Sequence, residues 1–134
     1  MKHHVITIRS IAQSVGAAGR CISSGKQFGL DIKNFDAITP SDNPVDMAMD
    51  LGINVEGFHE VYSRYDNCVA AFMSHFTLWS MCLEQNEEFT IFEHDAIIVN
   101  DIPEYIPYKE VISLGKPSYG KWNDPKTFGV NPLT

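Results

Sequence analysis

Hydrophobic and polar positions along the first third of the chain predict a strand, a helix and a second strand. The short β-branched run His4–Ile8 is typical of a buried strand in a mostly parallel sheet. Small and apolar residues near helical spacing then predict a helix over Ile11–Phe28. The alternating segment Ile32–Ile38 predicts the second strand. The residues that fall near helical spacing are Ile11, Val15, Ala18 and Ile22.

The longest periodic segment predicts a second helix. It follows a turn-rich excursion over Pro40–Arg64, in which Val45–Leu51 is expected to form one or two helical turns. We expect Asp66 or Asn67 to cap the long helix. Its apolar residues recur at spacings of three and four, which favours a buried stripe that includes a core Trp79. The residues of this stripe are Val69, Phe72, Met73, Phe76, Trp79 and Leu83.

Further strands are predicted after this helix. Phe89–Phe92 forms a compact apolar run that ends at Glu93, Ala96–Val99 forms another, and Glu110–Leu114 predicts one more strand. The alternating order indicates an α/β fold, and the length of 134 residues favours one domain over 1–134. From residue 116 onward the composition is loop-like, so the domain is expected to lack much of a C-terminal half.

Composition narrows the classes of function. Seventeen acidic and ten basic residues give a net charge of −7, and the basic residues are scattered, which argues against a nucleic-acid ligand. No window approaches the roughly 18 apolar residues that a membrane span needs. Three cysteines without CxxC spacing indicate reduced thiols. These features predict a soluble protein in the cytoplasm.

Two adjacent histidines precede the first strand. His3 and His4 are able to bind a metal, but neighbours in an extended segment point to opposite faces. We therefore interpret them as an exposed leader.

The acidic cluster Glu93-His94-Asp95 is the main candidate for chemistry. Ligands of open α/β sheets bind outside the carboxyl ends of the strands, and this cluster follows a strand directly. In extended geometry both carboxylates would point to one side and His94 to the other. Such a pair suits Mg²⁺ or Mn²⁺ bound together with a nucleoside diphosphate. Two solvated carboxylates at a strand end are the alternative.

The residues around this cluster resemble a known family. The segment CVAAFMSHFTLWSMCL, a short polar gap and FTIFEHDAIIV are similar to glycosyltransferase family 25, which includes lipopolysaccharide and collagen galactosyltransferases. The family pattern is Ala-x-x-x-Ser-His-x-x-x-Trp, followed by a strand that ends in Glu-Asp-Asp-Ala. The matching positions are Ala70 or Ala71, Ser74, His75, Trp79, Glu93, Asp95 and Ala96. More loosely, the first strand with Arg9 and the segment Phe35–Ile38 extend the similarity.

This resemblance implies a Rossmann-like nucleotide-sugar-binding sheet of the GT-A type. It also implies donor-binding residues, with Glu93 and Asp95 holding Mn²⁺ or Mg²⁺. The sequence departs from the family pattern at two places. His94 stands where the family usually has a second Asp, and Thr39-Pro40 stands where it usually has Asp-Gly. The second departure concerns a loop that is expected to contact the donor. The expected donor-binding residues are Arg9, Arg20, Ser74, His75, Glu93 and Asp95.

Several of these roles have plainer alternatives. Arg9 and Arg20 are equally interpretable as surface charges, and His75 as a core or boundary residue of the helix. The catalytic base stays unassigned, because a residue beyond Thr134 is as good a candidate as those in the chain. By residue type alone, the candidates in the chain are Asp101, Glu104 and Asp124.

The leading hypothesis is an inverting glycosyltransferase that moves galactose or glucose from a UDP-sugar to a glycan or related acceptor. The main alternative is a non-catalytic or fragmentary nucleotide-binding module of the same fold. A third, a metal-dependent nucleotide-binding protein of another fold, disregards the Ser74-His75-Trp79 match. A homo-oligomer is one way to cover apolar surface left by a missing half.

Overall fold

The computed structural model describes residues 1–58, 63–114 and 131–132. The chain divides into two compact units, Met1–Val99 and Asn100–Thr134. The first unit contains β1 (Lys2–Thr7), α1 (Ala12–Lys26), β2 (Ile32–Asp36), the 3₁₀ turn η1 (Pro40–Asp42), α2 (Pro44–Asp50), α3 (Tyr65–Gln85) and β3 (Phe89–Glu93). The second contains β4 (Ile112–Ser113) and β5 (Asn131–Pro132).

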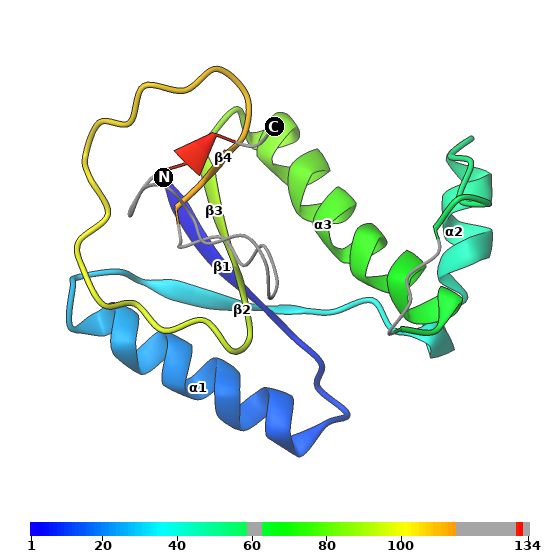
Figure 1. The fold of residues 1–134 in the computed structure, drawn as a ribbon, viewed down its shortest axis with the longest axis horizontal. Coiled ribbons are helices and arrows are strands. Elements are labelled where there is room, and N and C mark those ends of the chain that lie inside the picture. The colour runs from blue at the N-terminus through cyan, green and yellow to red at the C-terminus, as the bar shows by residue number, and fades with distance from the viewer. Residues whose placement is uncertain (59–62, 115–130, 133–134) are drawn as a thin grey trace, which may run out of the picture. The chain divides into compact units, whose positions relative to one another are not determined.

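The sheet of the first unit is parallel, with the strand order β2-β1-β3. Ile6 of the central strand is in register with Phe35 on one side and with Glu93 on the other. The carboxyl ends of the three strands therefore lie at one edge (Figure 1). This arrangement confirms the predicted α/β class and is consistent with a Rossmann-like fold.

The central strand is buried on both faces, as expected for a parallel sheet covered by helices. Val5, Ile6 and Thr7 are all buried. Val5 belongs to a core cluster with Ala18 and Cys21 of α1. Ile6 points to the opposite face, so the two sides of the sheet meet different helices.

Helix α1 confirms the predicted helix and turns small residues toward the sheet. Ile11 and Val15, two of the apolar residues near helical spacing, are exposed. Small side chains let a helix lie close to the strands, which explains why apolar spacing alone does not mark the buried face. The residues of α1 that are buried are Ser14, Ala17, Ala18, Cys21, Ser24 and Gly25.

Helix α3 lies where it was predicted, but its N-terminal cap and its buried face differ from the prediction. Its N-cap is Arg64, which makes no side-chain cap hydrogen bond, so the predicted cap at Asp66 or Asn67 was wrong. Trp79 is 43% exposed, which also overturns its placement in the core, and Leu83 is exposed as well. Apolar residues cover more than one face of this helix, so their spacing did not single out the buried one. The buried residues are Val69, Ala70, Met73, Ser74 and Leu78.

The chain beyond β3 does not continue the parallel sheet in the described residues. Ala96 and Ile98 pack against the α1 core without forming a strand. The predicted strand Glu110–Leu114 is reduced to β4, which pairs antiparallel with β5 in the second unit. Among the described residues, no helix is both long and apolar enough to cross a membrane.

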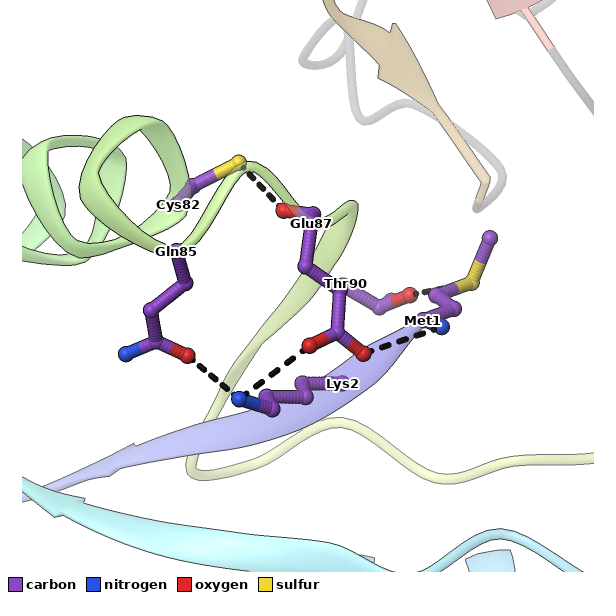
Figure 2. Close-up of polar contacts among 6 residues, drawn as sticks. All are labelled: Met1, Lys2, Cys82, Gln85, Glu87 and Thr90. Atoms are coloured by element: carbon purple, nitrogen blue, oxygen red, sulfur yellow. Dashed lines mark hydrogen bonds and ion pairs between the residues drawn. The ribbon is translucent and has the colours of Figure 1, made fainter.

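The first two residues form ion pairs with the connection between α3 and β3 (Figure 2). The ammonium of Lys2 lies 3.1 Å from a carboxylate oxygen of Glu87 and also donates to Gln85. The terminal amine lies 3.4 Å from the other oxygen of Glu87, and Cys82 donates to the Glu87 carbonyl. These contacts fix the start of β1 beside the start of β3.

His3 and His4 lie within β1, so their interpretation as an exposed leader was wrong. Both are half-buried, and their rings lie beside Phe92 and Phe89. His3 Nδ1 and His4 Nε2 are buried without a hydrogen-bond partner among the described residues. Burial is the main cause that lowers the pKa of both imidazoles.

Candidate functional site

A pocket of about 590 Å³ lies in the first unit, at the carboxyl edge of the sheet. It is bordered by the ends of β1 and β3, by the segment that follows β2, and by the N-terminal half of α3. Its volume is typical of a small-molecule site. Apolar residues line one part of it, namely Ile6, Ile8, Ile11, Ala37, Ile38, Ala70 and Ala71.

Two predicted site residues meet in this pocket. The Nε2 atom of His75 on α3 lies 2.8 Å from Oε1 of Glu93 at the end of β3. The His75 ring also lies beside Trp79, with a centroid separation of 6.0 Å. Helix and strand together therefore orient the Glu93 carboxylate, and this pair brings together two segments that the family pattern links.

The electrostatics of the pair favour an ionised Glu93. Its side chain is 61% exposed. The hydrogen bond with His75 is the largest cause that lowers the pKa of Glu93, and it outweighs the opposing effect of burial. His94 adds a smaller contribution in the same direction.

The acidic cluster does not have the extended geometry that we expected. Strand β3 ends at Glu93, and a turn follows in which the Ala96 amide donates to the Glu93 carbonyl at 3.0 Å. The rule of alternating sides therefore stops at Glu93. His94 lines the pocket, which contradicts the expectation that it points away, while Asp95 is exposed and is not one of the lining residues.

Ser74 has a position different from that of its neighbour His75. Its hydroxyl is buried, accepts the Ile38 amide at 2.9 Å and donates to the Ala70 carbonyl at 3.0 Å. Ser74 thus fixes the segment after β2 and not the acidic turn.

The Thr39-Pro40 departure from the family pattern has a structural consequence. Thr39 and Asp42 form a capping box around η1, with the Thr39 amide donating to Asp42 at 2.7 Å. Thr39, Pro40 and Ser41 all line the pocket. This hydrogen-bonded turn, which the sequence did not reveal, therefore supplies part of the pocket wall.

The two predicted arginines lie outside the lining of the pocket. Arg9, just after β1, forms an exposed ion pair with Asp36 at the end of β2. Arg20 is exposed on α1. Of the candidate bases, Asp101 and Glu104 are in the second unit, and Asp124 lies outside the described residues.

The described residues offer two carboxylates near the strand end but no larger ligand set. No group of three or more His, Cys, Asp or Glu side chains among them is arranged to hold a metal ion. A metal at Glu93 would therefore need ligands from a bound substrate or from water, as is common for Mg²⁺.

The chain is thus an α/β domain with a pocket outside the carboxyl ends of its parallel strands, which is the place where open α/β sheets bind ligands. The family model for Glycosyltransferase family 25 (LPS biosynthesis protein) matches residues 11–132. The chain therefore belongs to glycosyltransferase family 25, a class of sugar transferases whose description names lipopolysaccharide biosynthesis. No significant match exists among characterised proteins.

Proposed function

We propose that this chain transfers a hexose, galactose or glucose, from a UDP-sugar to a glycan or related acceptor in the cytoplasm, with the help of Mn²⁺ or Mg²⁺. One observation carries the proposal. The family's acidic residue Glu93 and its helical residue His75 meet at 2.8 Å in a pocket of suitable size at the carboxyl edge of the sheet.

Glu93 and Asp95 are the residues that would hold the metal. Both side chains supply oxygen ligands, which Mg²⁺ and Mn²⁺ prefer. Glu93 fits this role because His75 orients its carboxylate and lowers its pKa, which further favours the ionised form that a metal ligand needs. When bound, the metal would neutralise charge on the departing diphosphate.

The pocket suits the nucleoside part of the donor. Its isoleucines and alanines provide an apolar surface for a base, and Ser10, Thr39 and Asn67 provide polar groups at its border. We assign Arg9 and Arg20 to the donor's phosphates because guanidinium groups match phosphate oxygens. For Arg9 this requires the exposed ion pair with Asp36 to open, which costs at most about 1 kcal/mol.

The reaction requires an acceptor hydroxyl to attack the anomeric carbon while a carboxylate takes up its proton. We leave this base unassigned; Asp101 and Glu104 of the second unit are candidates by residue type. The GT-A type of fold, and a further half that builds the acceptor site, belong to the same proposal.

The test is an assay of hexose release and transfer from UDP-galactose and UDP-glucose, with Mn²⁺ or with a chelator. We expect turnover only with metal, and Asp95→Ala should abolish it. The matched control is Asp50→Ala, which removes another exposed aspartate at the end of α2. Nucleotide binding without turnover would favour the non-catalytic module, and turnover that survives chelation would contradict the role of the metal.

A further inference from the structure

Serines on the helices hold the segments that follow the strands of the parallel sheet. Each serine hydroxyl accepts a backbone N–H at 2.9 Å. Ser14 of α1 binds the Ile8 amide after β1, and Ser74 of α3 binds the Ile38 amide after β2. Ser24 of α1 binds the Ile98 amide beyond β3.

These serine hydroxyls accept hydrogen bonds from backbone amides just beyond the strand ends. Such an amide has no neighbouring strand to bond to, and burying an amide without a hydrogen-bond partner costs free energy. Ser14 and Ser74 are each 2% exposed and Ser24 is 9% exposed, so water does not compete well for these amides. The hydroxyls of Ser74 and Ser24 donate to carbonyls of their own helices, those of Ala70 and Cys21, which leaves a lone pair free for the incoming N–H.

Two of the three anchored residues belong to the pocket. Ile8 and Ile38 both line it, whereas Ile98 does not. The turn at Glu93 is closed by its own hydrogen bond from Ala96, so it does not depend on Ser24. The three serines thus make the same kind of contact, but only Ser14 and Ser74 act on the wall of the pocket.

We propose that Ser14 and Ser74 are positioning residues of the donor site, which fix two wall segments of the pocket before the nucleotide binds. This inference rests on the proposed function. The two serines act through Ile8 and Ile38, whose backbone they hold in place. Fixing these segments in advance lowers the ordering cost of binding.

Three single substitutions, Ser14→Ala, Ser74→Ala and Ser24→Ala, test the proposal in the full chain. Alanine favours helices, so all three variants are expected to fold. Each should lower the urea midpoint by a similar amount. With Mn²⁺ present and all proteins folded, the Kd for UDP should rise about tenfold in the Ser14 and Ser74 variants and stay within twofold in the Ser24 variant, the matched control.

Amide hydrogen exchange provides a readout that needs no ligand. Each variant should speed exchange at its own amide, namely at Ile8, Ile38 or Ile98. Equal losses of UDP affinity in all three variants, or a loss in none, would overturn the positioning role. Unchanged amide exchange at Ile8 and Ile38 would show that the serines do not hold these amides. A wild-type protein that binds no UDP would overturn the proposed function, and with it the donor role of the two serines.

Discussion

The Nε2 atom of His75 lies 2.8 Å from Oε1 of Glu93, and this contact joins the middle of α3 to the last residue of β3. The two residues are 18 positions apart in sequence. Since β3 pairs with the central strand, the contact also fixes the acidic end of the sheet against the helix that borders the pocket. The imidazole thereby orients the Glu93 carboxylate and lowers its pKa.

The pKa of Glu93 should depend on His75. In His75→Ala the pKa of Glu93 should rise, because the hydrogen bond that lowers it is lost. A carboxyl group with a lowered pKa in the folded state stabilises the fold above its unfolded pKa, and this stabilisation is lost as the pH falls through the folded value. The wild-type protein should therefore lose more stability on acidification than the variant does.

Carbon NMR of the glutamate carboxyl groups in the metal-free protein measures this pKa directly. His75→Gln is the matched control, since its amide can still donate to Glu93, and its Glu93 pKa should lie between those of the wild type and the alanine variant. An unchanged pKa in His75→Ala would show that the contact does not control the carboxylate.

The packing of α1 predicts opposite effects for two glycines. A Cβ at Gly25 would overlap Cδ1 of the buried Ile32 and come within 3.2 Å of its Cγ1, so Gly25→Ala should destabilise the fold by about 1–3 kcal/mol. A Cβ at Gly19 meets no atom within 4 Å, so Gly19→Ala should stabilise it by about 0.5–1 kcal/mol. Urea unfolding measures both, and a stabilising Gly25→Ala would refute the close packing of α1 on β2.

The half-buried histidines of β1 should make the fold sensitive to mild acid. Burial is the main cause that lowers the pKa of His3 and His4 in the folded state. The unfolded chain takes up protons as the pH falls through about 6.5, while the fold resists protonation. The free energy of unfolding should therefore fall from that pH down to the folded pKa values.

Urea midpoints at pH 7.5 and pH 5.5 measure this loss. In the double variant His3→Gln, His4→Gln the loss should be smaller, because glutamine does not titrate. An equal loss in the variant would assign the acid sensitivity to other groups.

The parallel sheet was predictable because β1 and β3 contain short apolar runs and β2 lies in an alternating segment. Phe89–Glu93, for example, ends at the acidic residue where the pattern placed the end of the strand. Boundaries were less predictable where a polar residue continues a strand, as at Lys2 and His3 in β1. The exposure of Trp79 was missed because α3 has apolar residues on several faces, and only the packing of the other elements selects one of them.

The sequence predicted residues that belong to the site, but it did not predict how the chain turns around them. The family pattern named His75 and Glu93, and the structure brings them together. The turn after Glu93 and the lining position of His94 were missed, since strand alternation does not predict where a strand stops. The anchors at Ser14 and Ser24 were missed because a buried serine on a helix has no periodic signal in sequence.

The central claim is a metal-dependent nucleotide site at the acidic end of the sheet. Calorimetric titration of UDP into the protein, with and without Mn²⁺, tests it most directly when it is repeated on Asp95→Ala and on the control Asp50→Ala. The account predicts UDP binding that needs Mn²⁺, is lost in Asp95→Ala and is kept in Asp50→Ala. UDP binding that is equally strong without metal, or that Asp95→Ala leaves unchanged, would contradict it.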